Sequence, residues 1–321
     1  MATQHPAIVI ETPEFVLHTK QRGLWSQAWQ RLIRNRLAVV AGVLLLVVIA
    51  MATLTSVSDT FERYDPHVQQ YEQIQSGPNS KHFLGTDNLG RDIWSRMWEG
   101  MRISLKIGIG TQVIVLIIGI AVGAGAALGG KWTDNILMRF TDLMFAFPDL
   151  LAIIIMRAVL SERDWPIIGT GDPQIPGFPG LLLQVIFAIS LVAWVTTARL
   201  VRGQMLSLKE SDYVMAARAL GASTPRIVFT HMLPNTLGPV IVAVTFGIPL
   251  AIFAEAVLGF IGFGLPPPTA SLGTLVNDGF LYYRVNEWMI LVPSVAIAVL
   301  MLCFTFLGDG LRDALDPRTR R

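Results

Sequence analysis

Six long apolar stretches recur along the chain and are separated by polar segments. They cover residues 37–57, 104–128, 141–160, 181–201, 236–262 and 288–307. A helix needs about 20 predominantly apolar residues to cross the hydrocarbon core of a bilayer. The pattern therefore predicts an all-α, polytopic membrane protein with six transmembrane helices.

The positions of the basic residues predict how these helices are oriented. An even number of spans places both termini on one side of the membrane. If that side is the cytoplasm, the inner segments hold most of the 25 Lys and Arg residues. Five lie before the first span, two are Lys131 and Arg139, five run from Arg199 to Arg226, and four follow the last span. Because cytoplasmic loops are enriched in Lys and Arg, we expect both termini to be cytoplasmic.

The composition agrees with a membrane protein. Apolar residues make up 52% of the chain and charged residues 15%, with a mean hydropathy of +0.53; soluble domains carry about 25% charged residues. The net charge of +2 gives no indication of nucleic-acid binding. The one cysteine, Cys303, lies in an apolar stretch, which excludes a disulfide framework and a cysteine zinc motif. We expect no metal site.

The N-terminal tail, residues 1–36, is polar and holds Glu11 and Glu14 before any apolar stretch. This order differs from that of a cleavable signal peptide, so we expect the first span to remain as an anchor. Residues 21–36 carry apolar side chains at helical spacing among basic ones: Trp25, Trp29, Leu32 and Ile33. The spacing fits either an interfacial helix on the anionic inner leaflet or an ordinary basic flank of the first span.

The cytoplasmic segment at residues 207–235 is polar, although it lies between two apolar spans. Helix-forming residues at 213–220 precede Gly221, which suits the left-handed residue that ends many helices. A Ser-Thr-Pro sequence follows and fits the N-cap and first turn of a second helix. Pro234 is expected to end that helix or to kink it into the fifth span. The segment is thus predicted to form two short helices, and a DNA-reading helix-turn-helix is disfavoured by the flanking spans.

The end of the second span resembles a phosphate loop. In GAALGGKW, residues 125–132, the spacing of two glycines and Lys131 matches that loop, but Trp132 stands where a Ser or Thr would hold magnesium. The stretch also ends a membrane span and does not follow a strand. We therefore expect no ATPase site in this chain. With Gly119 and Gly123, these glycines are expected to allow close helix packing.

Two carboxylates lie inside predicted spans, where ionisable residues are rare and suggest function. Asp149 follows Asp142 by seven residues, which would put it about 10 Å inside the inner boundary of the third span. Glu255 lies in the outer half of the fifth span. Each either lines a polar pathway or gate, or is a structural carboxylate bonded to a neighbouring span or an arginine. Phe260 and Phe263 are further candidates for the pathway or gate.

The outer loop contains LGTDNLGRD, residues 84–92, in which charged residues alternate with glycines. We expect a structural turn in which Arg91 pairs with an aspartate. Across the whole chain the five histidines fall outside the predicted spans. No Ser–His pair or His–Glu metal pair therefore lies at membrane depth, which argues against the alternative of an intramembrane enzyme. A receptor or assembly scaffold without transport activity is a third hypothesis.

Several stretches resemble the permease subunits of ABC importers. In AARALGASTPRIVFTHMLPN, residues 216–235, the paired alanines, the glycine and the Leu-Pro pair resemble the family's cytoplasmic loop signature. The chain departs from it at Met215, which replaces an acidic residue, and at His231, which takes an aliphatic position. FLGTDNLGRDIWSRMWEGMRISL, RFTDLMFAFPDLL and EAVLGFIGFGLPPPTASLG resemble the C-type subunit of the dipeptide/oligopeptide and nickel branch. The resemblance covers roughly residues 25–316.

The resemblance implies a type I ABC importer permease fold whose coupling helices dock into a cleft of an ATPase. It implies peptides as substrate, with nickel, oligosaccharides or another small solute as the alternative, and a prokaryotic cytoplasmic membrane as location. The implied partners are a second permease subunit, two ATP-binding subunits that bind ATP and Mg, and an extracytoplasmic substrate-binding protein. This chain itself would hold no cofactor. The residues implied to couple to the ATPase are Ala216, Ala217, Gly221, Ala222, Ser223, Leu233 and Pro234.

These predictions divide the chain into five parts. A cytoplasmic tail at 1–36 leads into a first transmembrane helix at 37–57 and an external loop at 58–103. A five-helix permease core at 104–308 follows and contains the coupling segment. A second cytoplasmic tail is expected at 309–321.

Overall fold

The computed structural model describes residues 24–58, 61, 63–161 and 177–316. This part of the chain is helical, and no β-strand forms in it beyond an isolated bridge between Thr86 and Asp92. The helices, in chain order, are α1 (Leu24–Arg34), α2 (Arg36–Leu54), a 3-10 turn (Tyr71–Gln73), α4 (Ile93–Leu128), α5 (Gly130–Ala146), α6 (Asp149–Ser161), α7 (Gly180–Lys209), α8 (Asp212–Ala219), α9 (Thr224–Ile227), a π-helical turn (Val228–Met232), α10 (Leu233–Phe260), α11 (Leu272–Tyr282) and α12 (Trp288–Leu315).

Five of the six predicted spans are confirmed as continuous apolar helices long enough to cross a membrane. They are α2, α4, α7, the joined helix Thr224–Phe260 and α12. The predicted third span, 141–160, is wrong as a single helix, because α5 and α6 meet there at a bend of 92°. The break falls at Phe147 and Pro148. Proline lacks an N–H and disfavours helical geometry in the residue before it, so the helix ends there.

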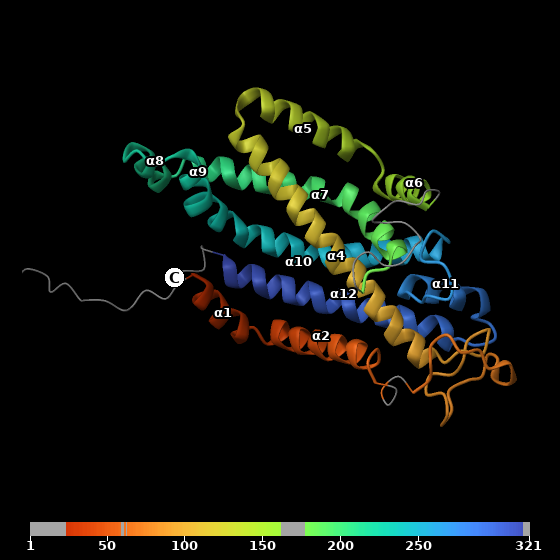
Figure 1. The fold of residues 1–321 in the computed structure, drawn as a ribbon. Coiled ribbons are helices and arrows are strands. Elements are labelled where there is room, and N and C mark those ends of the chain that lie inside the picture. The colour runs from red at the N-terminus through yellow and green to blue at the C-terminus, as the bar shows by residue number, and fades with distance from the viewer. Residues whose placement is uncertain (1–23, 59–60, 62, 162–176, 317–321) are drawn as a thin grey trace, which may run out of the picture.

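The long helices run side by side, and functional segments gather at their two ends (Figure 1). At one end lie α8, α9, the short helix α1 and the C-terminal end of α12. At the other end lie α11 and the segment that joins α2 to α4. The N-terminal and C-terminal helices thus begin and end together, as an even number of crossings requires. Helix α1 places Trp29 and Ile33 on its exposed surface.

Helix α4 is longer than predicted at its outer end. Its 36 residues begin at Ile93 and not near residue 104, because the Asp92 side chain accepts a hydrogen bond from the Ser95 N–H and caps the helix. At 1.5 Å per residue the helix is about 54 Å long, well beyond a hydrocarbon core of about 30 Å. The first turns of α4 can therefore lie outside the membrane, within the predicted external segment 58–103.

Glycines bring α4 and α7 into close contact, which confirms the packing prediction. A Cβ at Gly119 would lie 2.7 Å from Thr197, and one at Gly123 would lie 2.5 Å from the Ala198 carbonyl oxygen. The stretch that resembles a phosphate loop forms the end of α4 and the turn into α5. Gly130 makes that turn with a φ of +83°, which suits glycine and no other residue well.

Candidate functional site

The coupling segment is built on a Schellman motif, which explains its alanines and glycine. Helix α8 ends at Gly221, whose φ of +81° lies in the left-handed region. The Gly221 N–H donates to the Arg218 carbonyl, and the Ala222 N–H donates to the Ala217 carbonyl, both at 3.0 Å. These two bonds define the motif, and contact between its two alanines accompanies it. The predicted end of the first short helix is confirmed.

The second half of the segment differs from the prediction. Ser223 has the extended backbone of an N-cap and Pro225 lies in the first turn, as expected. However, α9 does not end at Pro234. It continues through the π-helical turn into α10, and Pro234 lies in the first turn of that helix, where its missing N–H is tolerated. The segment also begins later than residue 207, since α7 extends to Lys209.

The inner face of the segment is anchored on the transmembrane helices. Val214 of α8 is fully buried, and Ile227, Val228 and Met232 are buried beside it. They pack in one cluster with Ala127 of α4 and with Val201 and Met205 of α7. Three of the implied coupling residues, Ala217, Ala222 and Leu233, are half-buried against the same cluster. Helices α8 and α9 are thus held as one body with the ends of α4 and α7.

The outer face of the segment exposes large apolar side chains. Leu220 is 89% exposed, Phe229 is 70% exposed and Met215 of α8 is 50% exposed. These residues define what we call the apolar docking face: Met215, Leu220 and Phe229. The implied coupling residues Ala216, Gly221, Ser223 and Pro234 are exposed as well. Sequence reasoning missed Leu220 and Phe229, although the signal was present as apolar residues in a polar cytoplasmic segment.

The two departures from the family signature occupy different environments. Met215 belongs to the apolar docking face. The His231 ring lies 6.3 Å from the Tyr213 ring in an edge-on arrangement. Asn235 donates to the His231 carbonyl at 2.6 Å and to the Tyr213 hydroxyl at 3.4 Å. His231 therefore helps to hold α8 against the start of α10.

Replacing Gly221 with valine is expected to reduce transport by about tenfold or more. A Cβ there meets no atom within 4 Å, so the penalty comes from the left-handed backbone alone, at roughly 1–2 kcal/mol for an ordinary residue and more for a β-branched one. Gly221→Asn should retain most activity, because asparagine tolerates this conformation. The measurement is ATP-driven uptake by the assembled complex.

Gly238→Ala is the matched control, since Gly238 also has open space but lies within α10. Alanine favours a helix, so this variant should transport normally. Equal activity of Gly221→Val and Gly238→Ala would contradict the proposed role of the helix end.

Glu255 is enclosed between three helices at the outer end and is 1% exposed. Its Oε2 accepts a hydrogen bond from the Ser104 hydroxyl of α4 at 2.7 Å, and its Oε1 is buried without a hydrogen-bond partner among the described residues. The Ser104 oxygen in turn accepts the Leu272 N–H at 3.3 Å. In this conformation the Ser104 hydroxyl joins Glu255 of α10 to α4 and, through the Leu272 N–H, to the start of α11; no arginine bonds Glu255 in the described part of the chain. A role of Glu255 in a pathway or gate stays a prediction.

Ser104→Ala is expected to lower the stability of the assembled complex by about 1–3 kcal/mol. The substitution removes the hydroxyl that donates to the Glu255 carboxylate and accepts the Leu272 N–H. Both of these buried groups then lose a hydrogen-bond partner, which lowers the free energy of unfolding. The measurement is the midpoint of thermal unfolding in detergent. Thr236→Val is the control, because the buried Thr236 hydroxyl donates to the Met232 carbonyl one turn earlier and valine keeps the shape of the side chain. A loss no larger than that of the control would show that the Glu255 contact adds little.

The other pathway candidates lie at the surface of the chain. Asp149 is exposed and begins α6, beyond the full length of α5. The predicted position of Asp149 near the inner boundary is therefore wrong, because the 17 residues of α5 separate Asp149 from the inner end of this helix. Phe260 is the last residue of α10 and meets Phe280 edge-on at 5.4 Å. Phe263 is exposed in the loop that follows.

The outer loop forms a buried ion-pair network. The Arg91 Nε lies 2.7 Å from Asp87 Oδ2, which confirms the predicted Arg–Asp turn, and Arg96 Nε lies 3.3 Å from the same oxygen. Both guanidinium groups also face Asp278 of α11 at 3.5–3.8 Å. Burial raises the pKa of Asp278, and the two arginines oppose that rise. The network fastens the loop to α4 and α11.

A second carboxylate of this loop contacts a histidine. The buried His82 Nδ1 lies 2.8 Å from Asp92 Oδ1, and Asp92 also caps α4. Among the described residues, no group of three or more His, Cys, Asp or Glu side chains is placed to hold a metal ion.

Comparison with protein families identifies two regions. Residues 83–321 match the family described as "Binding-protein-dependent transport system inner membrane component". Residues 23–78 match "N-terminal TM domain of oligopeptide transport permease C". Together these matches include the outer loop, the coupling segment and all the apolar helices.

Curated relatives match nearly the whole chain. The oligopeptide transport system permease protein OppC of Bacillus subtilis is 38% identical over 302 residues, covering 94% of this chain and 92% of that protein. The glutathione transport system permease protein GsiD of Pectobacterium atrosepticum is 35% identical and covers 92% of each chain.

Solved structures share the fold. A chain of the inward-facing MetNI methionine ABC transporter superposes with a TM-score of 0.56 at 18% identity, covering 70% of this chain and 97% of that one. An amino acid ABC transporter chain gives a TM-score of 0.50 at 17% identity, with 68% and 93% covered. The architecture is therefore that of type I ABC importer permeases.

Proposed function

The chain belongs to the binding-protein-dependent transport system inner membrane components, and from this premise we propose that it forms half of the pathway of an ATP-driven peptide importer. It is a multi-pass permease subunit of an ABC importer and not an enzyme, since ATP hydrolysis lies in partner subunits. The observation that carries the coupling proposal is the apolar docking face, which is presented by helices rigidly anchored to the spans.

The continuity of α9 with α10 supplies a mechanism for coupling. The joined helix Thr224–Phe260 has 37 residues, or about 55 Å of rise. When two ATPases close on ATP, a cleft that holds Phe229 and Leu220 pulls on one end of this helix. Because the Val214 cluster ties the segment to α4 and α7, these helices move with it. The far end carries Glu255 and its contacts with α11, so the motion reaches the outer mouth and permits alternating access.

The proposed assembly contains a second permease subunit, two ATP-binding subunits and an extracytoplasmic substrate-binding protein in a prokaryotic cytoplasmic membrane. ATP and Mg are held by the ATP-binding subunits, and this chain holds no cofactor and binds no nucleic acid. Support for the second permease comes from α5, which exposes large apolar side chains that a partner or lipid would cover: Ile136, Phe140, Leu143 and Phe145.

Peptides are the proposed substrate because the relatives named above transport oligopeptides and glutathione, itself a peptide. Nickel, oligosaccharides or another small solute served by the same machinery is the alternative. The test is uptake by the reconstituted complex with its binding protein and a panel of di- to hexapeptides, with a nickel salt and an oligosaccharide included. Uptake of peptides alone supports the proposal, and uptake of only a non-peptide solute overturns the substrate while leaving the permease role intact.

A further inference from the structure

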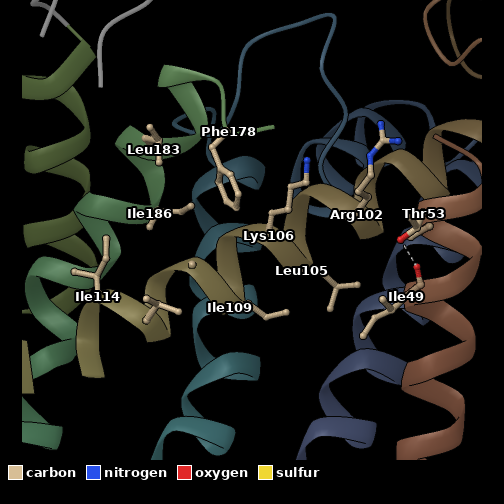
Figure 2. A pocket seen from close by; sticks show the side chains of 13 residues that line it. Ile49, Thr53, Arg102, Leu105, Lys106, Ile109, Ile114, Phe178, Leu183 and Ile186 are labelled. Atoms are coloured by element: carbon tan, nitrogen blue, oxygen red, sulfur yellow. Dashed lines mark hydrogen bonds between the residues drawn. The ribbon is translucent and has the colours of Figure 1, made fainter. Parts of the chain in front are cut away.

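An apolar cavity of about 480 Å³ lies between α2, α4 and α7 (Figure 2). Its walls are hydrocarbon for most of their extent, and the side chains that form them include Ile49, Leu105, Ile109, Val113, Leu183 and Ile186. Ile49, Ile109 and Val113 are also exposed on the surface of the transmembrane helices. The cavity is therefore reached from the region that the hydrocarbon of the membrane occupies.

Two cations stand at one edge of this cavity. Arg102 and Lys106 extend side by side above Leu105 and Ile109 in Figure 2. They lie one helical turn apart on α4, on its outer half. The Lys106 ammonium donates to the Gly177 carbonyl at 2.9 Å. No carboxylate of the described chain lies within 4.0 Å of either cation; Glu99, one turn before Arg102 on α4, feels the charge of Arg102 and lies 3.5 Å from His67.

A second cavity of about 440 Å³ begins where the first one ends. Arg102 and Lys106 line both, and the second one adds polar groups from Ser56, Glu99 and Thr269. An apolar cavity, a pair of cations and a second cavity, whose walls combine these polar groups with Leu181, Leu182 and Leu265, thus follow one another along the outer half of α4. This order is that of an acyl chain, a phosphate and a headgroup in a phospholipid.

We propose that these two cavities form a binding site for an anionic phospholipid. An acyl chain fills the apolar cavity, the phosphate contacts Arg102 and Lys106, and the headgroup lies in the second cavity beside Ser56 and Thr269. The charges are complementary, since cations at membrane interfaces attract anionic lipids. A peptide is a poor occupant of the apolar cavity, because its amide groups would find no hydrogen-bond partners on those walls.

The test uses the full importer complex, purified in detergent and studied by native mass spectrometry. Phosphatidylglycerol and the zwitterionic phosphatidylcholine are titrated separately. The wild-type complex should bind phosphatidylglycerol at least tenfold more tightly. The double variant Arg102→Gln/Lys106→Gln should lose that preference. Val113→Trp, which fills the apolar cavity from its exposed side, should reduce phosphatidylglycerol binding at least tenfold with both cations in place.

Arg284→Gln is the matched control, because Arg284 is an exposed cation at the same end of the molecule that lines neither cavity. It should bind phosphatidylglycerol as the wild type does. If the double variant does not assemble, Arg102→Lys/Lys106→Arg keeps both charges and should retain the preference. The proposal is overturned if the wild type binds the two lipids equally, or if Val113→Trp leaves phosphatidylglycerol binding unchanged, as it would when a helix of a partner subunit occupies the cavity.

Discussion

The double variant Leu220→Asp/Phe229→Asp is expected to lose its partner ATPases and with them all ATP-driven transport. Both side chains are exposed in the isolated chain, so their burial in a partner is the interaction that the variant removes. Central apolar anchors of interfaces are worth about 2 kcal/mol or more each. Losing two gives about 4 kcal/mol, or roughly a thousandfold weaker binding. Burying two unpaired carboxylates weakens it further.

The measurement is co-purification of the ATPases with a tagged permease. Because neither residue packs in the protein interior, the variant should still insert and unfold at the wild-type temperature. Leu281→Asp is the matched control: Leu281 is 67% exposed on α11, at the opposite end of the helices. The control should retain the ATPases. Full retention by the double variant would contradict the docking role of this face.

The substitution Asp87→Ala is expected to cause the largest loss of stability. It leaves the buried guanidinium groups of Arg91 and Arg96 facing each other, with the half-exposed Asp278 as the ion-pair partner that remains within 4.0 Å in the described part of the chain. Removing one partner of a buried ion pair costs about 3–5 kcal/mol. Asp87 Oδ1 also accepts the Leu89 and Arg91 N–H groups at 2.9 Å, and both bonds are lost.

Thermal unfolding in detergent, or the yield of folded protein, measures this loss. Asp87→Asn should fall between the wild type and the alanine variant, since its amide oxygen can still accept the two backbone bonds. Glu72→Ala, an exposed carboxylate of the same loop, should change stability by no more than about 0.5 kcal/mol. A similar small effect for Asp87→Ala would mean that the network does not hold the outer loop.

The lengths of the apolar stretches predicted most of the fold, because each helix that crosses a membrane needs about 20 apolar residues within its own sequence. The third span failed that reasoning for a tertiary cause. Helix α5 carries charges that its neighbour α7 neutralises: Asp134 lies 2.6 Å from Arg202, and Asp142 lies 2.8 Å from Arg199. Hydropathy averaged over a window of sequence does not include such ion-pair partners. The predicted span therefore began inside α5, at residue 141, and continued across the break at Pro148 into α6.

In the candidate site, features set by neighbouring residues were predicted from the sequence, and features set by residues far apart in the chain were not. Gly221 was predictable because a left-handed helix end is a property of a few consecutive residues. The partner of Glu255 was not, since Ser104 lies 151 residues away in the chain. Phe229 was also overlooked, because its exposure depends on Ile227 and Val228 facing the core while it faces outward. The π-helical turn that carries α9 into α10 has no clear local signal, and Pro234 left open whether the short helix ends or continues with a kink into the fifth span.

The central proposal is that the apolar docking face passes ATPase motion to a peptide pathway, and uptake into proteoliposomes tests it most directly. The complex is reconstituted with ATP in the lumen and with labelled peptide and the binding protein outside. We expect uptake that requires ATP, that persists in Leu281→Asp and that is absent in Leu220→Asp/Phe229→Asp. Uptake by the double variant at the wild-type rate would contradict the account.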